Sequence, residues 1–110
     1  VIRDYGETAV AVTAGGTITL NHEAGSYHHV TVDQNFTVAF SNWPTSGVVG
    51  SMTLELTQDS TARTPTWSNV DAWVGGFAPD ISTNGATYLL TFFTRDAGTT
   101  VIGTFIGEVA

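Results

Sequence analysis

One stretch decides the fold class of this chain, and it reads Ser51-Met52-Thr53-Leu54-Glu55-Leu56-Thr57-Gln58-Asp59. Apolar and polar side chains alternate along it, so that Met52, Leu54 and Leu56 share one face. A period of two is the period at which side chains point to opposite faces of a β-strand. The pattern therefore predicts a strand with one buried face and one solvated face.

Short segments of the same kind recur roughly every 10 to 15 residues, separated by residues that favour turns. No segment shows a helical period over more than about two turns. Threonine, which supplies most of the polar surface, is β-branched and fits a strand better than a helix. About eight short strands at this spacing predict a single all-β domain over residues 1–110, an antiparallel β-sandwich or jelly roll.

Two hairpins are expected, formed by Tyr27–Val32 with Phe36–Phe40 and by Tyr88–Arg95 with Thr100–Ile106. Most of Tyr88–Arg95 is apolar on both faces, which is typical of a strand at the centre of a sheet or at a subunit contact. Gly103 and Gly107 in the last strand predict a bulge or the close approach of another backbone.

The charge of the chain is low and one-sided. Charged residues are 12 % of the sequence, and three arginines without any lysine face ten carboxylates, which gives a formal net charge of −7. Binding to nucleic acid or to an anionic membrane needs a basic surface, so we expect neither partner. No apolar stretch approaches the roughly 20 residues of a membrane helix. The absence of cysteine excludes disulfides, thiolate metal sites and cysteine nucleophiles.

Residue types that bind metals crowd together at one place, which comprises His22-Glu23, His28-His29 and Asp33. On a strand, His28 and His29 point to opposite faces and cannot ligate one ion. A metal site would therefore need His22 to join one of them across a hairpin. The default interpretation is an exposed pair of histidines on an edge strand, and we expect no metal and no cofactor.

The sequence contains no catalytic constellation. Acid–base catalysis needs two carboxylates that face each other over a cleft, and Glu55 is the only acid in the middle of a predicted strand. The aspartates follow turn chemistry, in which the carboxylate hydrogen-bonds to nearby backbone; they are Asp33, Asp59, Asp71, Asp80 and Asp96. Serine-nucleophile and phosphate-loop motifs are absent. We therefore expect that the chain is not an enzyme.

Three tryptophans and three tyrosines raise the question of a carbohydrate platform, on which aromatic rings stack against sugar faces. The alternative is that these rings fill the core, as large aromatic residues often do. Trp43 precedes Pro44 in a loop and is the candidate for an exposed aromatic residue. Trp67 and Trp73 flank short strands and are expected to be structural.

Several motifs occur in a fixed order along nearly the whole chain. They are Asp4-Tyr5-Gly6-Glu7, Trp43-Pro44-Thr45-Ser46-Gly47, Ser51–Asp59, Thr64-Pro65-Thr66-Trp67, Trp73–Pro79, Leu89–Thr100 and Gly107-Glu108-Val109-Ala110. Together they resemble a small β-domain that is common in virion structural proteins of tailed bacteriophages. The chain departs from that family at Ser60-Thr61-Ala62-Arg63, where a glycine-rich turn commonly precedes the basic residue, so loop details are not carried over there.

The resemblance implies a structural role in the virion and no reaction. For a chain of this length without a second domain, it favours a capsid decoration (cement) protein, which clamps major capsid subunits from outside the shell. It also implies a homotrimer at local threefold points, with an N-terminal arm, Val1–Glu7, along the shell. The expected oligomer or capsid contacts are Val1, Ile2, Tyr5, Tyr88, Phe92, Phe93, Val101 and Phe105.

Two other functional classes stay open. The first is a tail-fibre or baseplate tip domain that binds host surface carbohydrate. The second is a free carbohydrate-binding module, which would be monomeric and would lose binding on Trp43→Ala. Copy number per particle separates a fibre tip from a decoration protein, because fibre tips occur in far fewer copies. Sedimentation of the purified protein separates the trimeric classes from the free module.

Overall fold

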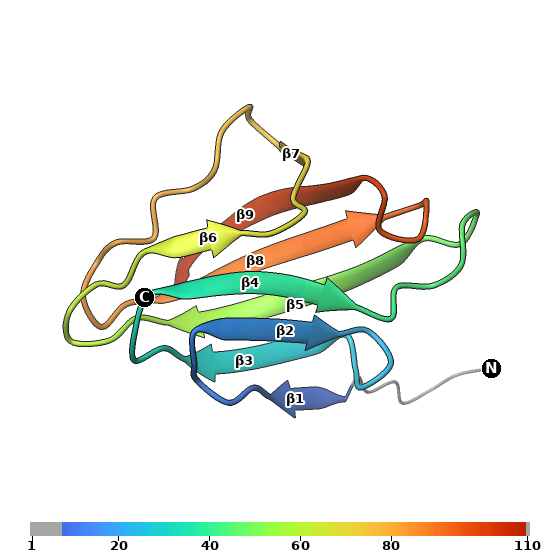
Figure 1. The fold of residues 1–110 in the computed structure, drawn as a ribbon. Helices are drawn as coiled ribbons and strands as arrows, with labels where there is room; N and C mark the ends of the chain where they lie inside the picture. The colour runs from blue at the N-terminus through green and yellow to red at the C-terminus, as the bar shows by residue number, and fades with distance from the viewer. Residues whose placement is uncertain (1–7, 110) are drawn as a thin grey trace, which may run out of the picture.

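The computed structural model describes residues 8–109, and this part of the chain consists of β-strands joined by loops and turns (Figure 1). No helix occurs in residues 8–109, and the chain is all-β, as predicted. The strands are β1 (Ala9–Ala11), β2 (Thr17–Asn21), β3 (Tyr27–Thr31), β4 (Phe36–Ser41), β5 (Gly50–Thr57), β6 (Pro65–Trp67), β7 (Ala72–Trp73), β8 (Thr87–Thr94) and β9 (Val101–Val109).

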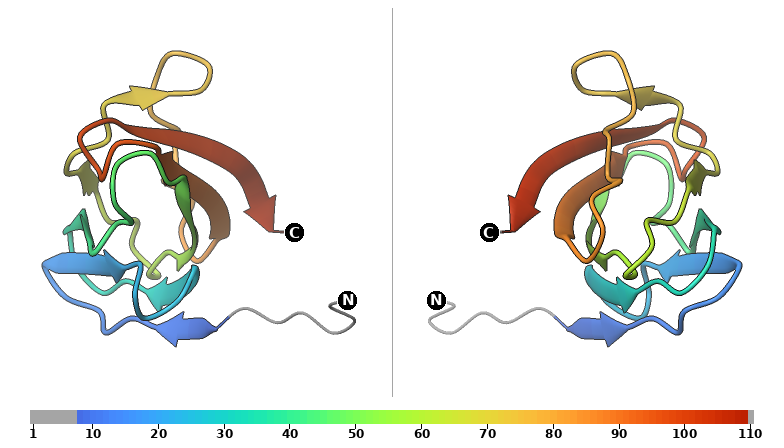
Figure 2. Two further views of the ribbon diagram at one scale, coloured as in Figure 1. Left: turned by 90° about the vertical axis from the view of Figure 1, so that its right-hand side faces the viewer. Right: turned by 90° about the vertical axis from the view of Figure 1, so that its left-hand side faces the viewer.

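The strands form two sheets. The larger has six strands in the order β1-β3-β5-β8-β9-β7, and the smaller has three in the order β2-β4-β6. The first six strands of the chain alternate between the sheets, and neighbours such as β3 and β5, or β4 and β6, run parallel. The chain therefore winds around a common interior. Figure 2 shows this path from two further sides.

The winding path corrects two expectations. β3 and β4 do not form the predicted hairpin, because β3 pairs with β1 and β5 whereas β4 pairs with β2 and β6. A fully antiparallel fold is also wrong, since among the described strands only β5 with β8 and β8 with β9 pair antiparallel. The physical reason is that alternation shows which side chains face the core and does not show which strand lies alongside. β3 and β4 face the same core from opposite sheets.

The second predicted hairpin is confirmed. β8 and β9 pair antiparallel from Thr94 opposite Val101 to Thr87 opposite Val109. Leu90 lies opposite Phe105 and Leu89 opposite Gly107, which leaves Ile106 as the extra residue of a bulge. β8 also pairs with β5, so it lies inside the six-stranded sheet, as its apolar sequence indicated.

Side chains from both sheets bury one another in a single core. Met52, Leu54 and Leu56 of β5 are fully buried, which confirms the alternation in the stretch that decides the fold class. Ile18 and Leu20 of β2 belong to the same core from the other sheet. Burial of an aliphatic side chain of this size contributes about 1.5 to 3 kcal/mol to stability.

An aromatic cluster joins the two sheets. The ring of Trp67 on β6 is 5.0 Å from that of Trp73 on β7, and Trp73 is 5.9 Å from Phe92 on β8, measured between centroids. This packing shows that Trp67 and Trp73 are structural, as expected. A Cβ at Gly103 on β9 would lie 2.7 Å from the Trp73 ring, so the close approach predicted at this glycine is made by a side chain.

Candidate docking surface

Large apolar side chains are exposed at three places in the described part of the chain. They are Val48 and Val49 in the loop before β5, Val74 and Phe77 in the loop after β7, and Phe105, Ile106 and Val109 near the end of β9. Apolar surface that gathers at defined places on a small domain often marks a site of contact with another protein.

The loop before β5 adjoins a groove of about 180 Å³ at one end of the six-stranded sheet. The groove is lined by Val49, Phe93, Thr94, Arg95, Thr100 and Ile102. Phe93 on β8 and Ile102 on β9 lie opposite each other and point away from the core, because their neighbours Phe92 and Val101 point into it. A hydrogen bond of 2.9 Å from the Gly47 amide to the Arg95 carbonyl holds the loop beside these strands.

The middle of the same outer face is rich in threonine. The hydroxyl oxygens of Thr53 on β5 and Thr91 on β8, which lie opposite each other, are 3.4 Å apart. The hydroxyl of Tyr27 on β3 donates a hydrogen bond to the Glu55 carboxylate on β5. This bond, together with burial and the charge of Glu55, raises the pKa of Tyr27 to about 12. The outer face therefore combines a polar, internally hydrogen-bonded middle with an apolar end.

The structure separates the contact residues predicted from the sequence into three groups. Tyr88, Phe92 and Val101 are at most 2 % exposed and belong to the core, so they offer no contact surface. Their positions alternate with outward ones along β8 and β9, and a sequence that is apolar on both faces does not show which set faces inward. Phe93 and Phe105 do reach the surface. Val1, Ile2 and Tyr5, with the predicted arm Val1–Glu7, lie outside the described residues.

Trp43 is not the exposed aromatic residue that its loop position suggested. It is half-buried, and its ring lies 5.5 Å from Phe40 and 5.7 Å from His22 between centroids. Contact with Gly98 covers another part of the ring. The most exposed aromatic side chain of the described chain is Phe77, at 78 %, and no sequence pattern singled it out.

The histidine pair differs from its default interpretation. β3 lies between β1 and β5, so it is not an edge strand, and His28 is fully buried while His29 is half-buried on the outer face. His28 Nε2 lies 3.1 Å from the Asn21 carbonyl oxygen, and Nδ1 has no hydrogen-bond partner in the described chain. Burial lowers the pKa of His28. In residues 8–109, no three acidic or histidine side chains are grouped to hold a metal ion.

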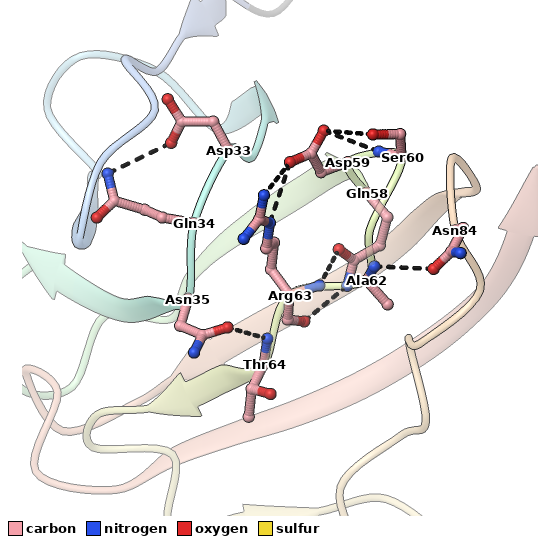
Figure 3. A network of polar contacts seen from close by, with 10 residues as sticks. All are labelled: Asp33, Gln34, Asn35, Gln58, Asp59, Ser60, Ala62, Arg63, Thr64 and Asn84. Carbon is pink, nitrogen blue, oxygen red and sulfur yellow. Dashed lines mark hydrogen bonds and ion pairs between the residues drawn. The ribbon is translucent and has the colours of Figure 1, made fainter.

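A second concavity, of about 230 Å³, lies between the loop after β5 and the loop before β8. It is lined by Ala62, Arg63, Thr64, Pro65, Pro79, Asp80, Ile81 and Ser82. The buried side chain of Gln58 holds these loops together: its amide donates to the carbonyl oxygens of Arg63 and Ile81, at 2.9 and 2.6 Å. Figure 3 shows the part of this network around Arg63 and Ala62.

Asp59 and Asp96 act in turns, as predicted, whereas the predicted turn role of Asp71 is wrong, because its carboxylate accepts a hydrogen bond of 2.7 Å from the distant Val101 amide. The carboxylate of Asp59 accepts a hydrogen bond from the Ser60 amide, and that of Asp96 accepts one from the Thr100 amide. Asp59 also pairs with Arg63 at 2.6 Å on the surface, and the Arg63 guanidinium holds the pKa of Asp59 below its usual value (Figure 3). The carboxylates of Asp59 and Asp96 are thus engaged with backbone groups of their own loops.

Comparison with protein-family models, with curated proteins and with solved structures finds no match for the chain. Residues 8–109 contain no helix with the length and hydropathy that crossing a membrane requires.

Proposed function

We propose that this chain is a structural protein of a tailed-bacteriophage virion and, more specifically, a capsid decoration protein. In this role it binds the outside of the major capsid shell and stabilises the shell. The sequence motifs support the virion class. The observation that supports docking is the groove lined by Val49, Phe93 and Ile102, which gives the threonine-rich outer face one apolar end.

The chemistry of this surface suits a partner that is neutral or basic. Val48 and Val49 are 51 and 72 % exposed beside the groove, so a partner side chain placed there removes apolar surface of both molecules from water. The chain carries a net charge of −7, which favours approach to a complementary surface over approach to another acidic one. An apolar centre with a polar surround is the usual anatomy of a protein–protein contact.

We also propose that the two sheets act as the layers of a β-sandwich. Ile18 of the smaller sheet and Leu54 of the larger one belong to the same buried core, which supports this description. A clamp needs a body that does not deform when its surface is loaded. Close packing between two sheets supplies that stiffness.

The concavity between the loops favours a tail-fibre or baseplate tip as a second candidate. Arg63, Asp80 and Ser82 bring a guanidinium, a carboxylate and a hydroxyl to its wall, and groups of these kinds hydrogen-bond to sugar hydroxyls. Gln58 fixes the loops that carry them. In this case the loops, and not the apolar end of the sheet, would make the functional contact.

Imaging of the phage particle that carries this chain tests the two candidates. A labelled copy of the chain is incorporated into particles, and its position and copy number are read from electron micrographs. Label spread over the capsid supports the decoration protein, and label restricted to the tail supports the fibre tip. Absence of the chain from purified particles contradicts both.

The docking surface is tested with Val49→Asp and a matched control, Val74→Asp. Both residues are largely exposed, and only Val49 lines the groove. Binding to shells that lack the chain is measured by co-sedimentation. We expect Val49→Asp to weaken binding and Val74→Asp to leave it unchanged, and equal binding by the two variants would rule out the groove as the contact.

A further inference from the structure

The end of β9 leaves one edge of the six-stranded sheet open. β7 pairs with β9 at Ile102 and Gly103, and the flanking amides of Asp71 and Val74 donate hydrogen bonds to the carbonyl oxygens of Val101 and Gly103. From Thr104 to Val109, β9 pairs with β8 on one side, and no strand within residues 8–109 pairs with its other side. Figure 2 shows this part of β9, in red, curving away from the rest of the sheet.

The open edge is largely apolar. Phe105, Ile106 and Val109 are 39, 57 and 50 % exposed, and Glu108 is the single charged residue of the stretch. Natural edge strands are protected from pairing by lysine, proline, a bulge or a covering segment. This stretch has the bulge at Ile106 and the charge of Glu108, and it has neither lysine nor proline. Open backbone groups beside exposed apolar side chains form a template for another strand.

We propose that this edge pairs antiparallel with the same edge of a second copy of the chain, about a twofold axis near Ile106. In this register Phe105 lies opposite Gly107, and an aromatic ring across from glycine covers the bare backbone. Glu108 lies opposite Thr104, so the two Glu108 carboxylates do not face each other. The two six-stranded sheets then join into one continuous sheet through a self-complementary contact.

A second copy is chosen as the partner because the stretch is self-complementary in this register, with Phe105 across from Gly107 and Glu108 across from Thr104. Two chains of net charge −7 repel each other at long range, so self-association has to use a segment with little charge. The stretch Thr104–Val109 is such a segment, and the proposed register moves its one acid away from the axis. The strand-to-strand contact is small, so the dimer belongs to the weak class of interfaces. This inference is independent of the proposed function, and it yields a dimer where the resemblance implies a homotrimer.

Sedimentation velocity of the 110-residue chain at about 1 to 500 µM tests the inference, since this range spans a weak dissociation constant. Ile106→Lys places a charge on the edge, and Val74→Lys is the matched control because Val74 is 64 % exposed and lies on the loop after β7. We expect wild type and Val74→Lys to dimerise, with a dissociation constant for Ile106→Lys at least about tenfold higher. Thermal unfolding of each variant checks that the fold is retained.

Hydrogen exchange supplies a readout that does not depend on a variant. We expect amides between Thr104 and Val109 to exchange more slowly as the wild-type concentration rises. A monomer at every concentration, a trimer, or equal weakening by the two lysine variants would overturn the inference. If Ile106→Lys does not fold, exchange at these amides that is unaffected by concentration overturns it as well.

Discussion

The side-chain amide nitrogen of Gln58 lies 2.6 Å from the carbonyl oxygen of Ile81 and ties together two loops that are distant in sequence. The same side chain exchanges hydrogen bonds with the backbone of Arg63 on the opposite loop. Gln58 is buried, so its backbone partners have no ready access to water. A polar residue at the end of an alternating strand is therefore a structural link between loops.

We predict that Gln58→Ala destabilises the protein by about 2 to 4 kcal/mol, because the backbone groups of Arg63 and Ile81 lose their partners inside the protein. The free energy of unfolding is measured by urea denaturation. Gln34→Ala is the control, since Gln34 is exposed and makes only a 3.4 Å contact with Asp33. The control is expected to change stability by less than about 0.5 kcal/mol. Equal losses for both variants would show that Gln58 does not link the loops.

Gly98 is predicted to tolerate no side chain. Its φ is +87°, and a Cβ would lie 2.5 Å from Cδ1 of Trp43. Gly85 has a φ of +72°, and no atom lies within 4 Å of a Cβ placed there. Gly85→Ala therefore measures the cost of backbone strain alone, about 1 kcal/mol. We expect Gly98→Ala to cost about 1 to 3 kcal/mol more, since overpacking against the indole is added. Urea denaturation measures the loss of stability in each variant, and tryptophan fluorescence reports the change around Trp43. Equal losses of stability in Gly98→Ala and Gly85→Ala would exclude the Trp43 contact.

Stability is predicted to fall in mild acid because of His28. Burial lowers the pKa of His28 below its ordinary value of 6.5, so the unfolded chain binds a proton more readily than the folded one. The neutral ring contributes its full stability above about pH 6.5, and this contribution is lost as the pH falls toward the lower pKa of the folded state. The charged ring would also bring a second buried N–H at Nδ1, which has no acceptor in the described chain.

The acid-dependent loss is measured by urea denaturation between about pH 8 and pH 4.5, together with the titration of His28 by NMR. Asp59 and Asp96 do not titrate within this pH window, because their pKa values are held below 3.8. Their contributions to stability are lost only at lower pH. His29→Gln is the control and is expected to retain the loss. A His28 resonance that titrates above pH 6.5 would contradict the prediction.

The Tyr27–Glu55 hydrogen bond is predicted to be visible in a tyrosine titration. The carboxylate of Glu55 accepts the phenolic proton, and this raises the pKa of Tyr27 to about 12. Glu55→Gln removes the charge and weakens the bond, so the pKa of Tyr27 should move back toward its ordinary value of 10. NMR of ring-labelled tyrosine measures the shift. Thr53→Ser on the same strand is the control, and a Tyr27 titration that is identical in Glu55→Gln and wild type would refute the coupling.

The candidate docking surface is formed by residues that are far apart in the sequence, and no local sequence pattern predicts that they lie together. Val49 and Ile102 line one groove because β5, β8 and β9 are neighbours in the sheet, and their separation in sequence does not indicate this. Phe93 was predicted as a contact residue from the sequence, but so was Phe92, which is buried in the core. Trp43 was placed in a loop correctly, and its packing against Phe40 and Gly98 follows from contacts between distant segments.

Local sequence patterns were enough to predict the all-β class, the inward face of β5, the β8–β9 hairpin with its bulge and the turn roles of Asp59 and Asp96. Each of these depends on side-chain period or on bonds between residues close in the chain. No local pattern predicts that β3 and β4 lie in different sheets or that the outer face ends in an apolar groove, and both become evident in the folded molecule. The reason is that several distant strands have apolar faces that could pair equally well. Which of them pair is determined by the packing of the whole core.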